Sequence, residues 1–491
     1  MATSCRLQRV LIVGDRGRKP NKVLRNARGP LSQEVLAEKL NASIYRATGQ
    51  VAEISSKVIS DYERGWYQWP REPLRSAFCE VLGVRTPEEL GFQNPRSGPR
   101  PSAPASVDLL ALAGTRSASG PVECVRVPGG RSYFGADLSA HYTTANRQGS
   151  ELFLVEPSEE MLAGLVRPDR RSLVVAVDRD RRSYVADGRR FMDRAGRGIG
   201  PQAVSAANVV DDLTLGVIWA TTNADSSLLA DDGHLERSQA YVTDQESRSV
   251  SRGDVEEVPL LNPVAGQWLG SQFCSRHILR NLDQLGEEPL FWTREQRGEE
   301  AAAWLLWSHK FDYLRRTSRR FTTLRRGFCI PESEVQASPG YERVLLLLAM
   351  ALMEGFGIKV ELSVEPEHAE VEGFVLAGQA VVANWLGSPG LWCVEASAPA
   401  SRLVTYRELA GQVSGESSLP QTTPAGRLEA LADHLQVPWG WFRRRCTELA
   451  TVGVDDVCHP RSRLLSTRGL NTAISFVSYI DVLEGEDFAR R

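Results

Sequence analysis

The first ninety residues carry hydrophobic side chains at helical spacing, interrupted by polar and small residues. Ser32 and Ser55 are suitable N-cap residues, and Gly65 and Gly83 are suitable helix stops. A polar stretch, residues 41–49, separates the second predicted helix from the third. We therefore expect four helices, at residues 21–27, 33–40, 56–64 and 71–82.

The pattern changes after residue 93. Prolines mixed with Ser, Gly and Ala fill residues 94–106 and cannot pack a core, so residues 94–118 are expected to form a linker. Residues 119–255 predict a β-rich lobe, because two strand-like runs, 172–177 and 183–186, flank a polar turn. Residues 256–485 alternate helix-like and strand-like segments, and we expect an α+β region there.

Several elements of this last region can be placed. A capping-box pattern that starts at Thr293 predicts one long helix, whose apolar stripe continues through Trp304 to Leu314. The apolar run 344–353 predicts a buried helix, and helices are expected again from Pro424. Strands are expected at residues 358–364, 373–376, 379–385 and 391–395. The predicted fold class is multidomain: an all-α N-terminal domain followed by a mixed α+β C-terminal region.

Composition excludes several classes of protein. Of 491 residues, 42% are hydrophobic and 24% charged, which is typical of globular proteins. The ten-residue run 344–353 is far shorter than the roughly 20 residues that a membrane-spanning helix needs. The N-terminus lacks a secretory pattern, so we expect a cytoplasmic protein with no membrane partner. The 8 cysteines are scattered with no C-x-x-C pair, which predicts free thiols.

Charge is distributed unevenly. Residues 1–95 hold 15 Lys and Arg against 10 Asp and Glu, although the whole chain has a net charge of −3. Residues 1–20 form a basic arm ahead of the helical residues 21–93. A basic arm before a small domain indicates a polyanionic partner, and a solvated tail is an equally good interpretation by charge alone.

The third predicted helix has two distinct faces. Val58, Ile59 and Tyr62 lie on one face and are expected to pack, while small hydroxyls and cations occupy the other. Such a face suits a major groove, because hydroxyls reach base edges and cations neutralise phosphates. In an alternative interpretation, Glu63 and Arg64 form a structural ion pair. The candidate DNA contacts are Arg28, Gln33, Ser55, Ser56, Lys57, Ser60, Asp61 and Arg64.

The sequence resembles a known family at this point. Leu31-Ser-Gln-Glu-Val-Leu-Ala37, Val58-Ile-Ser-Asp-Tyr-Glu-Arg-Gly65 and Glu89-Leu-Gly-Phe92 are similar to the lambda-repressor-like (XRE) helix-turn-helix. The long insert between the second and third helices, with Tyr45–Gly49, is similar to that of large actinomycete regulators of this family. The resemblance implies major-groove binding by residues 55–64, and the insert could add a backbone contact through Tyr45 or Arg46. The C-terminal region resembles those of the same regulators, which adds no mechanism.

Motifs for catalysis or metal binding are weak. The 7 histidines include no H-E-x-x-H, and neither a phosphate loop nor a G-x-S-x-G elbow occurs. Glutamates 361–372 surround His368, which suggests a solvated loop more than a carboxylate pair. Arginines 315–326 could bind an anion or form a solvated helix face. Residues 431–445 have the spacing of a second helix-turn-helix, although a terminal helical bundle fits them better.

These observations predict a transcription regulator that binds double-stranded DNA and is not an enzyme. The small footprint of one helix-turn-helix favours a homodimer, formed through a C-terminal region that dimerises or senses a small-molecule or protein effector. No cofactor or metal is expected. The alternatives are an enzyme or a protein-interaction scaffold with an appended helix-turn-helix.

Overall fold

The computed structural model describes residues 20–480, apart from 49–50, 53, 66–68, 71, 85, 93–106, 114–121, 166–169, 196–199, 248–251, 254–260, 287, 372, 378, 386–391, 396–399 and 416. Contacts divide the chain into two compact units, Met1–Pro101 and Ser102–Arg491. Within the described ranges, none of the helices has the length and apolar content needed to span a bilayer. Six cysteines of these ranges form no disulfide, namely Cys79, Cys124, Cys274, Cys329, Cys446 and Cys458.

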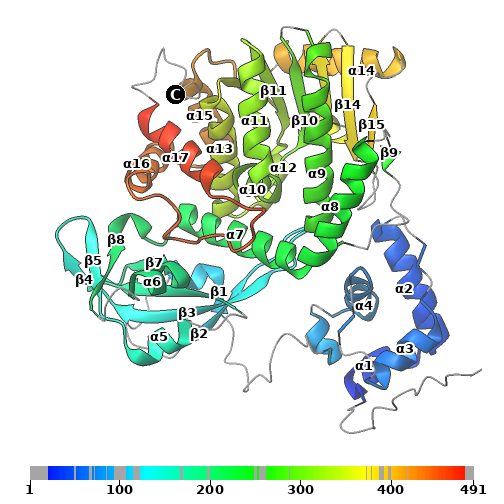
Figure 1. Ribbon diagram of the computed structural model, residues 1–491, viewed down its shortest axis with the longest axis vertical. Helices are drawn as coiled ribbons and strands as arrows, with labels where there is room; N and C mark the ends of the chain where they lie inside the picture. The colour runs from blue at the N-terminus through cyan, green and yellow to red at the C-terminus, as the bar shows by residue number, and fades with distance from the viewer. Residues whose placement is uncertain are drawn as a thin grey trace, which may run out of the picture. The chain divides into compact units, whose positions relative to one another are not determined.

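The described part of the N-terminal unit is helical (Figure 1). The Asn21 side chain caps the first helix by accepting from the Leu24 amide, and Gly83 ends the fourth with a φ of 67°. Tyr62, Phe78 and Phe92 form the aromatic centre of its core, with ring centroids 5.2 to 5.8 Å apart. The elements are α1 (Lys22–Arg28), α2 (Gln33–Thr48), α3 (Ser56–Glu63), α4 (Leu74–Leu82) and a 3-10 turn, Pro87–Leu90.

All four predicted helices of this unit are present, but the expected polar stretch at residues 41–49 is wrong. Helix α2 continues to Thr48, because Ser43 and Ile44 are buried against the rest of the unit. Asn41 then fixes the start of the next segment: its side chain donates to the Ile54 carbonyl and accepts from the Ile54 amide, at 3.0 and 2.9 Å. Helix α4 begins three residues later than expected, at Leu74.

The C-terminal unit opens with two sheets. One has five strands in the order β1-β2-β3-β6-β7, and the other has three in the order β4-β5-β8. The predicted hairpin is confirmed as β6 and β7, which pair antiparallel. The elements are β1 (Val107–Asp108), β2 (Glu123–Val127), β3 (Ala136–Thr144), β4 (Asn146–Gln148), β5 (Leu152–Val155), α5 (Glu159–Leu165), β6 (Arg171–Val177), β7 (Ser183–Asp187), α6 (Gly188–Ala195) and β8 (Gln202–Ser205).

A seven-stranded mixed sheet follows, in the order β12-β11-β10-β13-β14-β15-β9. Strands β10, β11 and β12 run parallel, and β13 pairs antiparallel with β10. The strands are β9 (Arg252–Gly253), β10 (Leu290–Glu295), β11 (Leu324–Cys329), β12 (Ile358–Ser363), β13 (Phe374–Ala377), β14 (Gln379–Trp385) and β15 (Trp392–Glu395). The four strands predicted after residue 357 are therefore confirmed.

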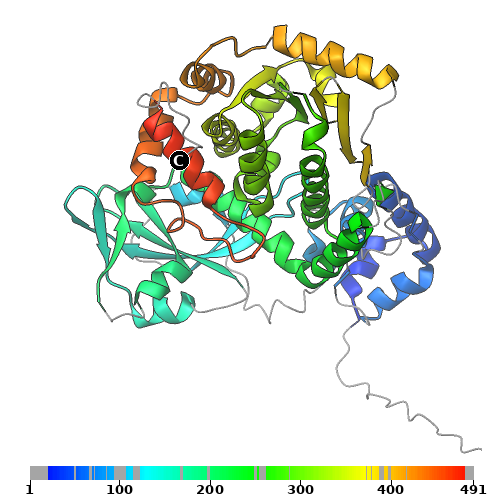
Figure 2. The same ribbon diagram turned by 45° about the horizontal axis from the view of Figure 1, so that its top comes forward.

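Helices pack around these sheets, and the predicted buried helix is confirmed as α13. Figures 1 and 2 show the last helix, α17, in red beside α16, and α17 also contacts α13. The helices are α7 (Asp212–Ala230), α8 (Asp232–Ser247), α9 (Pro263–Arg280), α10 (Gly298–Leu306), α11 (Ser308–Arg320), α12 (Glu332–Ala337), α13 (Gly340–Gly355), α14 (Ala400–Gly415), α15 (Pro424–His434), α16 (Trp439–Ala450) and α17 (Arg468–Tyr479).

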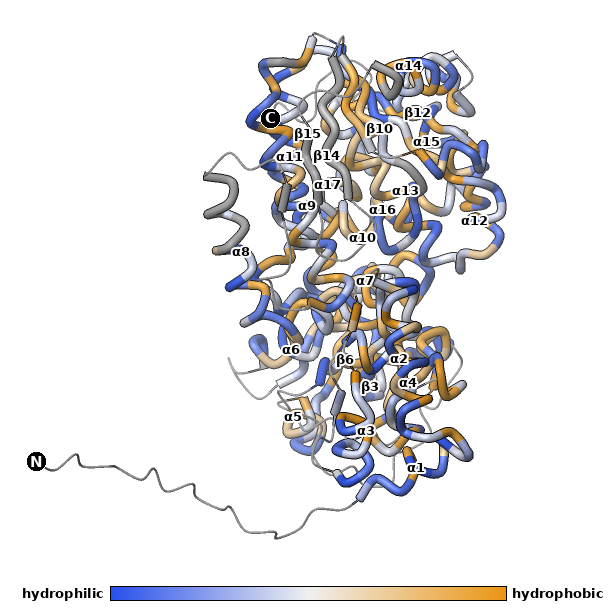
Figure 3. The backbone as a smooth tube through the Cα atoms, turned by 90° about the vertical axis from the view of Figure 1, so that its right-hand side faces the viewer, coloured by the Kyte–Doolittle hydropathy of each residue, from blue (hydrophilic) through white to orange (hydrophobic). Residues whose placement is uncertain are grey.

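The expected boundaries within residues 94–485 need correction. Leu109 and Leu112, which the predicted linker included, are fully buried in the C-terminal unit, and β1 pairs with β2 there. One hydrophobic core then runs from Leu109 to Ile480 and joins the predicted lobes 119–255 and 256–485. Figure 3 shows hydrophobic segments gathered inside this unit. The two lobes belong to one unit, because α7, from the first lobe, packs against α10 and α13 of the second.

The helix predicted to start at Thr293 is also corrected. Residues 290–295 form strand β10, and the helix begins after Arg297, whose backbone amide donates to the Glu300 carboxylate at 2.6 Å. The expected long helix is two helices, α10 and α11, because Trp307 between them is extended, with a ψ of 118°. This break lets α11 return along the sheet beside α9.

Candidate functional site

The predicted recognition face of α3 is accessible. Lys57 and Arg64 are exposed, and Ser56, Ser60 and Asp61 are half-buried on the same side, while Ile59 and Tyr62 are buried. Ser55 is exposed at the N-cap position with an extended backbone, although its side chain makes no capping hydrogen bond. The face thus combines two exposed cations with hydroxyls and one carboxylate within α3 and its C-cap residue, Arg64.

Two other predicted contacts, Arg28 and Gln33, are used inside the unit. Arg28 Nε lies 2.6 Å from Glu63 Oε1, and Gln33 Nε2 donates to Glu63 Oε2 at 2.8 Å. The side chain of Arg28 is only 14% exposed, and it also donates to the Leu31 carbonyl. Glu63 therefore ties α1, α2 and α3 together. The alternative in which Glu63 pairs with Arg64 is wrong, because the Glu63 carboxylate is occupied by Arg28 and Gln33.

Of the two residues suggested to contact the DNA backbone from the insert, Tyr45 is accessible and Arg46 is in an ion pair. Tyr45 has 56% of its surface exposed on α2. Arg46 lies 2.9 Å from Glu80 of α4, and Ser43 donates to the other oxygen of that carboxylate at 2.7 Å. Because the Arg46–Glu80 pair is solvent-exposed, it is weak and can be exchanged for another anion.

A carboxylate also lies beside α3. The Glu34 side chain accepts hydrogen bonds from its own backbone amide, from Ser32 and from Ser56, and these bonds lower the pKa of Glu34. Glu34 stands in the first turn of α2, where a negative charge complements the helix dipole. Glu34 therefore places a negative charge near the Ser56 hydroxyl at the start of the candidate interface.

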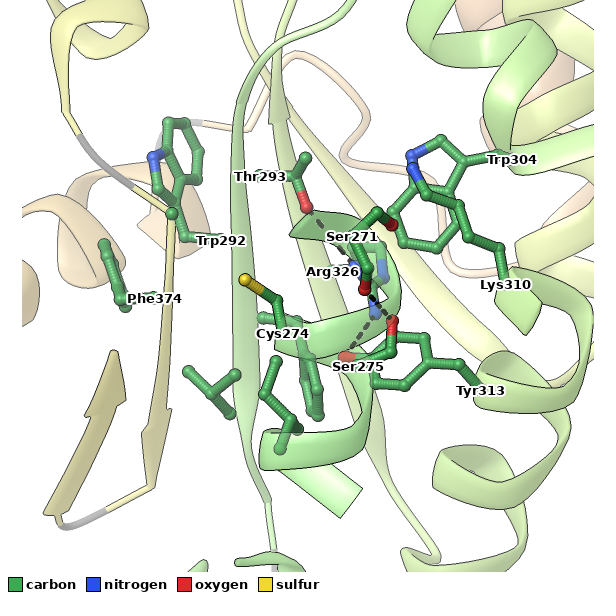
Figure 4. Close-up of a pocket in the computed structure, with 14 residues that line it drawn as sticks. Ser271, Cys274, Ser275, Trp292, Thr293, Trp304, Lys310, Tyr313, Arg326 and Phe374 are labelled. Atoms are coloured by element: carbon green, nitrogen blue, oxygen red, sulfur yellow. Dashed lines mark hydrogen bonds between the residues drawn. The ribbon is translucent and has the colours of Figure 1, made fainter. Parts of the chain in front are cut away.

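The arginine cluster of residues 315–326 separates into two environments. Arg316, Arg319 and Arg320 are exposed on α11, as expected for a solvated helix face. Arg326 is only 3% exposed, and it lies in β11 on the floor of a cavity of about 250 Å³ (Figure 4). The sequence held one signal for this difference: an arginine in a central parallel strand, where both faces are buried, must point into the interior.

The other weak constellations do not form sites. Glu365, Glu367 and Glu370 are exposed on a short 3-10 turn, and His368 binds the Ser363 hydroxyl at 2.7 Å. Among the residues that the structure describes, no group of three or more His, Cys, Asp or Glu side chains could hold a metal ion. The helix pair at residues 431–445 is packed into the main core through Leu431 and Phe442, which supports the interpretation as a terminal bundle.

Comparisons with protein-family models, with curated proteins and with solved structures found no match to this chain.

Proposed function

We propose that the protein is a sequence-specific DNA-binding transcription regulator whose α3 enters the major groove. The observation that carries the proposal is the exposed face of α3, with Lys57 and Arg64 one helical length apart and hydroxyls between them. Hydroxyls and Asp61 are suited to base edges, since a carboxylate accepts from the cytosine amino group. The similarity of residues 31–37, 58–65 and 89–92 to the XRE helix-turn-helix supports the same interface.

The internal network around Glu63 supports this role indirectly. A recognition helix must be held in a fixed orientation for its side chains to read bases. Glu63 connects the end of α3 to Arg28 and Gln33, and Asn41 anchors Ile54 just before α3 begins. We therefore assign Arg28 and Gln33 a positioning role, in place of the direct contacts predicted for them.

The proposal includes binding as a homodimer. A single short helix covers one half-site, and a two-fold dimer would double the interface while reading a palindrome. The C-terminal unit is the larger one and would supply the dimer contact. Light scattering of the full chain at micromolar concentration tests this, because a mass of 54.2 kDa would identify a monomer.

The deciding experiment is a genome-wide capture of bound DNA with the full chain. Wild type is compared with Lys57→Ala/Arg64→Ala, and with the control Lys22→Ala/Lys39→Ala, which removes the same charge from exposed positions on α1 and α2. We expect a sharp motif in wild type and in the control, and its loss in the α3 variant. Broad binding in wild type, or equal loss in both variants, would contradict the proposal.

A further inference from the structure

The cavity beside β11 has a polar end and an aromatic wall. It lies between α9, α10, α11 and the strands β10, β11 and β13, within the C-terminal unit (Figure 4). Two cations, Lys310 and Arg326, reach it from α11 and β11. The hydroxyl groups that line it belong to Ser271, Ser275, Thr293 and Tyr313, and the large apolar side chains are Phe291, Trp292, Trp304 and Phe374.

Arg326 is held by aromatic rings and not by a carboxylate. Its guanidinium carbon lies 4.9 Å from the ring centroid of Phe291, 4.8 Å from that of Trp304 and 5.7 Å from that of Tyr313. Its hydrogen bonds are long, at 3.3 Å to the Thr293 hydroxyl and 3.5 Å to the Tyr313 hydroxyl, and its Nε has no partner. Because the rings cover the planar faces, the N–H groups at the edge remain available to an acceptor.

Lys310 brings a second cation to the same place. Its ammonium lies 4.0 Å from the ring centroid of Trp304. Burial lowers the pKa of Lys310 to about 7; Glu300 opposes this shift, and the positive charge of Arg326 adds to it. Burial also raises the pKa values of the Cys274 thiol, to about 12, and of the Tyr313 hydroxyl, so both stay neutral. Among the described residues, neither Lys310 nor Arg326 forms an ion pair with a carboxylate.

We propose that this cavity binds a small organic anion, whose carboxylate or phosphate group contacts Arg326 and Lys310 and whose apolar body lies against the aromatic wall. A buried charge without an ion-pair partner, such as Arg326, is costly, and a bound anion would compensate it together with the half-buried Lys310. The edge of a guanidinium matches a carboxylate or a phosphate through two parallel hydrogen bonds. The volume of about 250 Å³ admits a compact molecule, near the lower end of small-molecule sites.

This proposal concerns the C-terminal unit and does not rest on DNA binding. It is tested by calorimetric titration of the full chain with benzoate, phenyl phosphate and the neutral isostere benzamide. The two anions distinguish a carboxylate ligand from a phosphate ligand. The variants are Lys310→Met and Arg326→Gln, and the control is Arg316→Gln, which removes an exposed charge from the same helix as Lys310. Circular dichroism confirms that each variant is folded.

We expect at least one anion to bind with a submillimolar dissociation constant, and benzamide to bind at least about tenfold more weakly, since one charged contact contributes about 1.5–3 kcal/mol. Lys310→Met removes a charge that is costly to bury, so this variant should fold normally and bind the anion at least about tenfold more weakly. Arg316→Gln should leave the dissociation constant of the anion unchanged. Binding should also weaken as the pH rises above about 7 in wild type but not in Lys310→Met. Absence of anion binding, equal binding of benzamide, or equal loss in the control would overturn the proposal.

Discussion

Arg28, the last residue of α1, and Glu63, the last residue of α3, form an ion pair with 2.6 Å between Nε and Oε1. Gln33 donates to the same carboxylate, so removal of Glu63 leaves two polar side chains without their acceptor. We expect Glu63→Ala to lower the free energy of unfolding of this unit by about 1–3 kcal/mol. Hydrogen exchange of α1 and α3 peptides in the full chain measures this. Unchanged protection would show that the network does not hold α3.

Salt dependence separates positioning residues from contact residues. Each phosphate that a protein neutralises adds about 0.9 to the slope of log affinity against log salt concentration. If Lys57 and Arg64 both contact phosphates, the double alanine variant should lose about 2 from this slope. Gln33→Ala should reduce affinity without changing the slope, because Gln33 is uncharged and binds Glu63. Fluorescence anisotropy titrations at about 50 to 200 mM salt measure the affinity and the slope.

The helices and strands with a regular hydrophobic period could be predicted from the sequence. The run Val344–Met353 and the hairpin of β6 and β7 are examples, because each is defined by its own residues. The extension of α2 could not be predicted, since it depends on tertiary contacts: Ser43 and Ile44 are buried, and Ser43 donates to Glu80, 37 positions away. Thr293 looks like a helix cap in sequence, but its neighbours Phe291 and Trp292 place it in a buried strand.

For the candidate sites too, only features defined by local sequence could be predicted. The exposed face of α3 follows from the spacing of its own polar residues, and the structure leaves Lys57 and Arg64 accessible as expected. The partners of Arg28 and Gln33 depend on how three helices pack, which no local pattern encodes. Arg326 is surrounded by rings from β10, α10 and α11, so the cavity to which it belongs becomes visible only once these elements are assembled.

A second buried ion pair joins α13 to α15. Both oxygens of the Glu354 carboxylate accept from Arg427, at 2.8 and 2.6 Å, and the first also accepts from the Val360 amide. Removing one partner leaves the other buried and uncompensated, so Glu354→Leu should lower the free energy of unfolding by about 3–5 kcal/mol. The double variant Glu354→Leu/Arg427→Met should regain a large part of that loss. Urea unfolding of both variants checks this, and equal stability of the two would contradict it.

Glu342 should make the stability of the C-terminal unit fall between mildly acidic and neutral pH. Burial raises the pKa of Glu342 from 4.5 to about 7, and the neighbouring carboxylates Glu299 and Glu300 add to the shift, while Arg297 opposes it. Between these two values Glu342 holds more protons in the folded state than in the unfolded state, so its contribution to the free energy of unfolding decreases as the pH rises through this window and levels off above it.

Urea midpoints at pH 5 and pH 7.5 measure this effect. Relative to wild type, Glu342→Gln should shift the difference between the two midpoints in favour of pH 7.5, because the amide does not titrate. His277 and His309, whose pKa values burial lowers, make stability rise with pH below 6.5 in both proteins, so the comparison between the two proteins isolates Glu342. The exposed Glu429 of α15 offers the matched control, and Glu429→Gln should keep the wild-type difference. Lys310 does not disturb the comparison at the acidic end: its lowered pKa of about 7 makes stability rise with pH only above that value. A wild-type midpoint that is higher at pH 7.5 than at pH 5, and equally so in Glu342→Gln, would show that the Glu342 carboxyl is not desolvated.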